Sequence, residues 1–162
     1  MAVNGVAIGL PGTGYTPVPA LRPPRRLTFQ RITPDDWSDL LAIMEECYKT
    51  PFDPEAVYRW GMAALQNPTI IAVRSADAFG LAQAAGLPWL PKEIHGCQLY
   101  IAMRPKAVWQ GVRIMRIMAN WCTGVMGAVD YQFGEATGMR MEIFAKRLGA
   151  RPNRPTYILG GA

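Results

Sequence analysis

The sequence predicts an α/β or α+β fold: a single domain with a central mixed β-sheet flanked by helices, preceded by an extended N-terminal arm. Helical and strand patterns alternate along the second half of the chain, and two strand-like runs joined by a short turn indicate antiparallel pairing in its middle. Glycine and proline interrupt every pattern near the N-terminus. Since 162 residues are enough for one core, we assign residues 1–26 to the arm and residues 27–162 to the domain.

The arm carries most of the excess positive charge. The chain has 17 Lys and Arg against 12 Asp and Glu, a net charge of +5. Residues 1–34 contain no acidic residue, and their four basic residues are Arg22, Arg25, Arg26 and Arg31. The rest of the chain is therefore nearly neutral, which argues against a domain whose surface is built for nucleic acid.

The first half of the domain contains one predicted strand and two predicted helices. Residues 27–32 alternate as a strand does, and Thr33 is an N-cap candidate before Pro34. The apolar stripe of the first helix has the spacing i, i+3, i+4, i+7 and consists of Trp37, Leu40, Leu41, Met44 and Tyr48. A second helix is predicted to begin at Asp53 and to end at Asn67.

Three consecutive strands are predicted in the middle of the chain. Residues 69–74 form a β-branched run, residues 78–90 are predicted to pair with it through a turn at 75–77, and residues 95–104 form a central strand. The remaining predicted elements are a helix at 108–129, a strand at 130–134, a helix at 138–148 and a strand at 156–159.

Composition excludes several classes of protein. Half of the residues are hydrophobic and only 18% are charged, which excludes a wholly disordered chain. No apolar run is long enough to predict a membrane span, and the arginines of the arm follow its apolar part, unlike in a signal peptide. The wide spacing of Cys47, Cys97 and Cys122 predicts reduced thiols rather than a disulfide framework or a metal site.

Two segments resemble the GCN5-related N-acetyltransferase (GNAT) family, and the order of elements over residues 27–159 is similar to that of the same family. YIAMRPKAVWQGVRIMRIMANW (100–121) resembles its central strand, its pyrophosphate-binding loop and the helix behind that loop. MEIFAKRLGARPNRPTYI (141–158) resembles its closing helix and last strand. The resemblance implies the GNAT fold and acetyl-CoA as a ligand.

The first segment implies a coenzyme A site at a helix N-terminus, where backbone N–H groups and the helix dipole bind the pyrophosphate. The family pattern Arg/Gln-x-x-Gly-x-Gly/Ala falls on residues 108–113. Its middle glycine is kept as Gly111, whereas Val108 and Arg113 differ from the pattern. The residues that the resemblance implies for the cofactor are Met103, Trp109, Gln110, Gly111, Val112 and Arg113.

The resemblance implies fewer catalytic residues than cofactor-binding residues. Many members of the family use a closing-helix tyrosine as general acid, and alignment places Ala145 there. Glu93 and Glu135 lie near strand ends and are candidates for a general base. His95, the only histidine, is interpreted as a strand-end residue because no nucleophile has the local sequence of a hydrolase site.

Two functions follow from these observations. The first is an interaction or structural protein that keeps the acetyltransferase fold and joins a larger, oligomeric assembly through its arm; proteins of this kind resemble ones encoded among bacteriophage particle genes. Arg22, Arg25 and Arg26 would then contact a protein partner; a solvated tail is the next interpretation of the arm, and nucleic acid is a weaker alternative. The second is an active acetyl-CoA-dependent N-acyltransferase acting on an amine. Either predicts a chain in the cytoplasm or in a virion.

Overall fold

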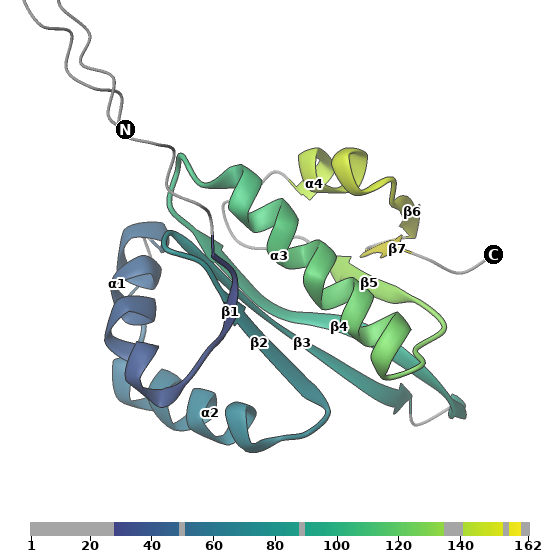
Figure 1. Cartoon of the computed structure of the whole chain (residues 1–162), viewed down its shortest axis with the longest axis horizontal. Helices are drawn as coiled ribbons and strands as arrows, with labels where there is room; N and C mark the ends of the chain where they lie inside the picture. The colour runs from purple at the N-terminus through teal and green to yellow at the C-terminus, as the bar shows by residue number, and fades with distance from the viewer. Residues whose placement is uncertain (1–27, 49–50, 88–89, 135–140, 154–155, 160–162) are drawn as a thin grey trace, which may run out of the picture.

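A seven-stranded β-sheet with helices on both faces forms the domain (Figure 1). The structure is a computed structural model, and it describes residues 28–48, 51–87, 90–134, 141–153 and 156–159. The strands are β1 (Gln30–Arg31), β2 (Ile70–Arg74), β3 (Ala78–Leu87), β4 (Leu90–Met103), β5 (Tyr131–Gly134), β6 (Arg151–Asn153) and β7 (Thr156–Leu159). The helices are α1 (Trp37–Cys47), α2 (Pro54–Gln66), α3 (Val108–Asn120) and α4 (Met141–Leu148), with the short helical turns η1 (Pro34–Asp36) and η2 (Trp121–Val125).

The sheet is mixed, as the sequence predicts. Its strand order is β1-β2-β3-β4-β5-β7-β6, and β4 lies at the centre. All neighbouring strands are antiparallel except β4 and β5, which are parallel. The predicted fold class is therefore confirmed.

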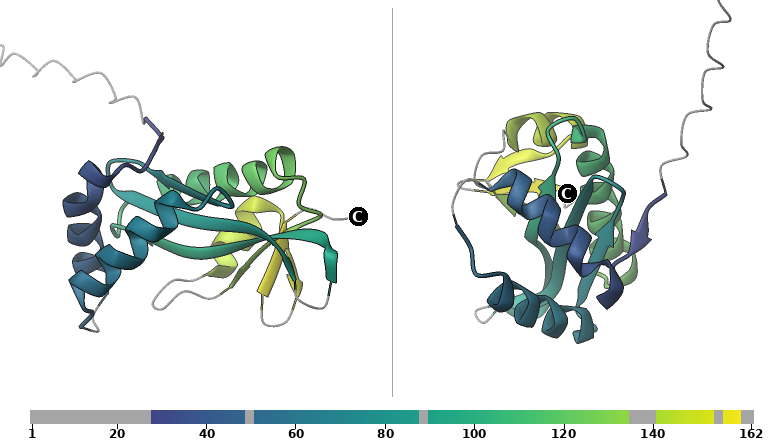
Figure 2. Two further views of the ribbon diagram at one scale, coloured as in Figure 1. Left: turned by 90° about the horizontal axis from the view of Figure 1, so that it is seen from below. Right: turned by 90° about the vertical axis from the view of Figure 1, so that its left-hand side faces the viewer.

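Helices cover both faces of the sheet (Figure 2), and an apolar layer lies between the sheet and the helices on each face. Alternation along β2 decides which residue joins which layer: Ile71 and Val73 pack on the α3 and α4 side, while Ala72 packs on the α1 and α2 side. Helix α2 begins as predicted, since the Asp53 side chain accepts hydrogen bonds from the amides of Glu55 and Ala56.

A β-bulge interrupts the long β3–β4 ladder. Leu81 lies opposite Tyr100, whereas the next residue, Ala82, lies opposite Gln98, so that Leu99 is an extra residue in β4. Leu99 and Tyr100, although consecutive, both pack on the α1 and α2 side of the sheet. A bulge bends the strand that contains it and increases its twist, so β4 changes direction here.

Some predicted boundaries are wrong, for local reasons. The helix predicted at 108–129 is regular only to Asn120 and continues as the π-helical turn η2, where the Thr123 hydroxyl donates to the Ala119 carbonyl. Gly127, with φ of +70°, ends this segment. Strand β6 was not predicted, because it has three residues and includes Pro152. In the described part of the chain, no helix is long and apolar enough to cross a membrane.

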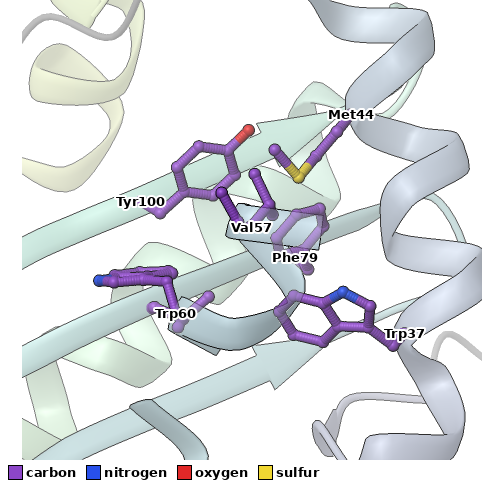
Figure 3. Close-up of a pocket in the computed structure, with 8 residues that line it drawn as sticks. Trp37, Met44, Val57, Trp60, Phe79 and Tyr100 are labelled. Carbon is purple, nitrogen blue, oxygen red and sulfur yellow. The ribbon is translucent and has the colours of Figure 1, made fainter. Parts of the chain in front are cut away.

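Helix α2 lies close to α1 because Gly61 has no side chain. The Trp37 indole, 6% exposed, fills the space that a Cβ atom at Gly61 would occupy. Trp37 in turn lies beside Val57 and Trp60 of α2 (Figure 3). The spacing of the two helices is therefore set by one glycine and one indole ring.

We predict that Gly61→Ala destabilises the protein. The methyl group would displace the buried indole, and we expect overpacking as close as this to cost about 2–3 kcal/mol, more than the ~1 kcal/mol that alanine adds to helix propensity. Thermal unfolding measures the effect. Gly124→Ala is the matched control, since a Cβ atom there meets nothing within 4 Å. Equal melting temperatures for the Gly61→Ala variant and the unsubstituted protein would contradict this packing.

Candidate functional site

The second half of β4 has an unpaired edge on the side of β5. Parallel pairing is confined to Gly96 with Tyr131 and Cys97 with Gln132, both before the bulge. Beyond the bulge, the described residues give β4 only β3 as a neighbour. We call residues 100–103 the free edge of β4. Such an edge presents backbone N–H and C=O groups that an extended ligand can pair with.

The hydrogen bonds at Met103 show which way this edge faces. The Arg104 amide donates to the Asp77 carbonyl, 2.9 Å away, so the backbone groups of Met103 point away from β3 in the antiparallel alternation. The Cys47 thiol, at the end of α1, donates to the Met103 carbonyl at 2.9 Å. Burial raises the pKa of this thiol, which therefore stays protonated at neutral pH. The C-terminal end of α1 thus lies at the free edge.

Helix α3 begins immediately after the free edge, and its N-terminus has no capping side chain. The N-cap is Ala107, and no acidic residue lies in the first turn. The first helical hydrogen bond runs from the Gly111 amide to the Ala107 carbonyl, so the amides of Val108, Trp109 and Gln110 precede the ladder. Unpaired amides and the helix dipole favour a bound anion, and the exposed Lys106 adds positive charge beside them.

Three of the predicted cofactor residues, Met103, Gly111 and Val112, contribute to packing. Gly111 lies against Met103 of β4, whose thioether occupies the position of a Cβ atom, with Phe144 of α4 also in contact range. Val112 is buried in the core on this face. Gly111 therefore brings the start of α3 close to the free edge of β4.

The other three predicted residues point elsewhere. The guanidinium of Arg113 lies over the Phe29 ring, 5.5 Å from its centroid, so it does not extend over the first turn of α3. The Gln110 amide group bonds Ser75 Oγ at 2.6 Å and the Asp77 carboxylate at 3.0 Å. Trp109, 66% exposed, is stacked under the Arg147 guanidinium at 4.0 Å.

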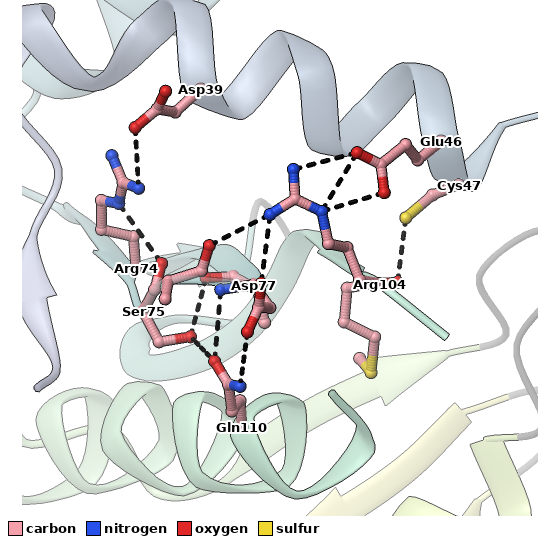
Figure 4. Close-up of polar contacts among 11 residues, drawn as sticks. Asp39, Glu46, Cys47, Arg74, Ser75, Asp77, Arg104 and Gln110 are labelled. Carbon is pink, nitrogen blue, oxygen red and sulfur yellow. Dashed lines mark hydrogen bonds and ion pairs between the residues drawn. The ribbon is translucent and has the colours of Figure 1, made fainter. Parts of the chain in front are cut away.

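A polar network fixes the end of β4 (Figure 4). Arg104 forms a bidentate ion pair with Glu46 of α1 at 2.9 Å and a second ion pair with Asp77 at 3.1 Å. The hydrogen bonds from Arg104 hold the pKa of the Glu46 carboxyl below its usual 4.5. Gln110 extends the network to α3. Helix α1, the β2–β3 turn, β4 and α3 are thereby joined at one point.

A pocket of about 400 Å³ lies beside the free edge, on the face of the sheet that α1 and α2 cover (Figure 3). Tyr100, at the bulge, forms part of its wall. Its ring stacks between those of Tyr48 and Phe79, with centroid distances of 5.8 and 5.4 Å. The remaining lining residues are Trp37, Met44, Ala56, Val57, Trp60 and Leu81.

The structure adds two tyrosines, Tyr48 and Tyr100, that the sequence did not indicate as site residues. Burial, and then the neighbouring Tyr48 hydroxyl, raise the pKa of Tyr100, so its phenol stays protonated at neutral pH. The phenol can donate a hydrogen bond but is a poor acid. Ala145 is buried in α4 and has no proton to supply.

Of the two predicted base candidates, only Glu93 lies among the described residues, and it does not meet this end of the sheet. Glu93 lies in β4 before the parallel pairing with β5 begins at Gly96, away from the free edge, and Glu135 lies outside the described residues. His95, near Glu93, contacts the Asp130 carboxylate through Nδ1 at 2.8 Å. Arg22, Arg25 and Arg26 also lie outside the described residues.

Comparison with known proteins shows the fold alone. No protein-family model matches the sequence, and no curated protein sequence matches it. Among solved structures, a GNAT family acetyltransferase from Brucella melitensis in complex with acetyl-CoA is similar over 85% of this chain and 89% of its own, with 13% identity and a TM-score of 0.61. The aminoglycoside 6'-N-acetyltransferase AAC(6')-Ih from Acinetobacter baumannii covers 78% of this chain and 91% of its own (11% identity, TM-score 0.62).

A transcriptional regulator from Bacillus halodurans C-125 is similar as well, over 79% of this chain and 95% of its own, with 9% identity and a TM-score of 0.66. One fold is thus shared with proteins named for different roles. These likenesses show that the domain has the GNAT fold, as its resemblance to the family implied.

We predict that the Glu46 carboxyl titrates below its usual range and that Arg104→Gln raises its pKa again. A lowered folded-state pKa means that the ion pair contributes its full stability above about pH 4.5 and loses it as the pH falls through the folded value. NMR titration of the side-chain carboxyl measures both values. Arg59→Gln, on α2, is the control and leaves the titration unchanged. A normal pKa for Glu46 would contradict the network.

Proposed function

We propose that the protein binds an acyl-CoA and transfers its acyl group to an amine. One observation carries the proposal: the free edge of β4 runs directly to the uncapped N-terminus of α3. A free strand edge suits an extended chain of amides, and an uncapped helix start suits a pyrophosphate. Pantetheine and pyrophosphate are joined in this order in coenzyme A.

The residues present fit such a ligand. Amides of Val108, Trp109 and Gln110 would hold the pyrophosphate, with Lys106 as an exposed cation close by in the sequence. Since these are backbone groups, the differences from the family pattern at Val108 and Arg113 do not remove them. Gly111 serves the site by its small size rather than by a contact of its own.

Acyl-CoA supplies an activated thioester, and the overall reaction forms an amide bond and releases the thiol of coenzyme A. The chain would orient the thioester along the free edge and exclude water through the aromatic pocket beside it. Tyr100 would donate a hydrogen bond from its protonated hydroxyl. Because Ala145 has no proton to give, the proton on the leaving thiol comes from solvent or from the amine itself.

A second candidate function rests on the arm and on the same substitutions. The Arg113 guanidinium lies over the Phe29 ring, and Ala145 stands where the resemblance to the family implies a tyrosine. Both suit a protein that keeps the fold for assembly, in a virion or another oligomeric complex, and contacts its partner through residues 1–26.

We predict that acetyl-CoA stabilises the protein and that Trp109→Asp weakens this effect. Ligand at about 100 times Kd adds about 2.7 kcal/mol, or roughly 5–10 °C in melting temperature. A negative charge in the first turn of α3 repels the pyrophosphate, so we expect about tenfold weaker binding. The matched control is Trp109→Asn, which removes the same ring without adding charge.

The two variants separate binding from stability. Without ligand, Trp109→Asp should be as stable as Trp109→Asn or more so, by about 0.3–1 kcal/mol, because an acidic residue favours a helix N-terminus. No stabilisation of the unsubstituted protein by millimolar acetyl-CoA would refute the acyltransferase function.

For the assembly function, the arm itself is the target. We predict that deletion of residues 1–26, or replacement of Arg22, Arg25 and Arg26 by glutamine, abolishes entry of the tagged chain into its native complex, because the arginines contact an acidic partner surface. Co-sedimentation from native cells measures this, with Arg59→Gln as control. Unchanged assembly of both altered chains would refute the role of the arm.

A further inference from the structure

The structure assigns the amine: we infer that the acceptor is a small aromatic amine whose ring enters the pocket between α1, α2 and the strands β3 and β4. This inference rests on the proposed acyl transfer and specifies its second substrate. It is carried by the chemistry of the pocket wall, by the position of the pocket beside the free edge of β4, and by its entrance.

The pocket wall is aromatic and uncharged. Four of its eight lining residues are the aromatic residues Trp37, Trp60, Phe79 and Tyr100, and the other four are aliphatic or methionine. Figure 3 shows these four rings around the space, carried by both helices and both strands. Flat ligands gain from edge and face contacts with such rings. A polycationic amine would need carboxylates, and none lines this pocket.

The size of the pocket suits a small molecule. Its volume of about 400 Å³ lies within the range of roughly 300–1,000 Å³ that is usual for small-molecule sites. One aromatic ring with a short amine chain fits this space, whereas a folded polypeptide surface does not enter it. The ion pairs of Arg104 with Glu46 and Asp77 lie outside the lining, so the pocket offers no competing charge.

The pocket lies beside the free edge of β4. Tyr100 belongs both to the pocket wall and to the bulge where the free edge begins. A ring held in the pocket beside Tyr100 would therefore place its amine next to the bound thioester.

The pocket also favours the reactive form of the amine. An ammonium ion loses hydration in an apolar space, so its pKa falls and the neutral, nucleophilic amine is more populated. An apolar wall therefore supports attack without a carboxylate base in the pocket.

The entrance lies on the α2 side. Trp60 is 48% exposed at the edge of the pocket, and Ala56 of the same helix is exposed as well. Coenzyme A would approach the free edge from the start of α3, which lies on the opposite face of the sheet. The two substrates thus have separate routes, which argues for an amine in this pocket and against the acyl chain of the thioester.

The test is whether 2-phenylethylamine binds to the full chain in the absence of coenzyme A. Binding is measured by titration calorimetry or by tryptophan fluorescence. We expect saturable binding, at least tenfold weaker binding to Trp60→Ala, and loss of binding to Ala56→Trp, which fills the entrance from an exposed position. Val125→Ala, 72% exposed and outside this pocket, is the control and binds normally. Spermidine, a polycation, should not compete.

Other results would overturn the inference. They are no binding of 2-phenylethylamine, binding that is insensitive to both pocket variants, or competition by spermidine. A Trp60→Ala variant that loses octanoyl-CoA but not acetyl-CoA would assign the pocket to an acyl chain instead. Acetyl-CoA stabilisation without amine binding would refute the acceptor and leave the acyl transfer standing; amine binding without acetyl-CoA stabilisation would refute the acyl transfer alone.

Discussion

The β-bulge at Leu99 is the constraint on which the candidate site depends. One extra residue in β4 ends its parallel pairing with β5 and leaves residues 100–103 with β3 as their neighbour in the described sheet. The same residue turns Tyr100 toward α1 and α2, where it becomes part of the pocket wall. Without the bulge, the pleat would reverse the faces of residues 100–103, and the free edge and the pocket would be lost together.

The open end of the sheet needs reinforcement, since β4 has lost one of its neighbours there. Arg104 supplies it by joining Glu46 of α1 to Asp77 of the β2–β3 turn, and Gln110 joins that turn to the first turn of α3. Exposed ion pairs are individually weak. A guanidinium that makes several hydrogen bonds, however, fixes the orientation of its carboxylate partners as well as their distance. The side chains at the start of α3 therefore maintain its position, while its backbone amides remain free for a ligand.

The sequence was enough to predict the order of elements, because capping residues, prolines and apolar periods are local signals. Asp53 caps α2 as its position suggests, and the turn at 75–77 joins β2 to β3. The site was less predictable. The strand HGCQLYIAMR is apolar on both faces, so one inserted residue leaves no break in its pattern, and neither Tyr100 nor the pocket could be inferred. Strand β6 has three residues and a proline, too few for any period.

The candidate site uses backbone groups for one part and side chains for the other. This explains how the chain can share its fold with proteins to which its sequence identity is very low. A site made of strand edge and helix amides tolerates Val108, Trp109 and Arg113, provided that Gly111 keeps α3 against Met103. Identities of 9–13% to proteins of the same fold are compatible with such a site. The pocket that we propose for the acceptor differs, because side chains alone form its wall. In the proposed acyl transfer, divergence that leaves thioester binding intact would therefore change which amine is accepted, and the aromatic wall would determine this specificity.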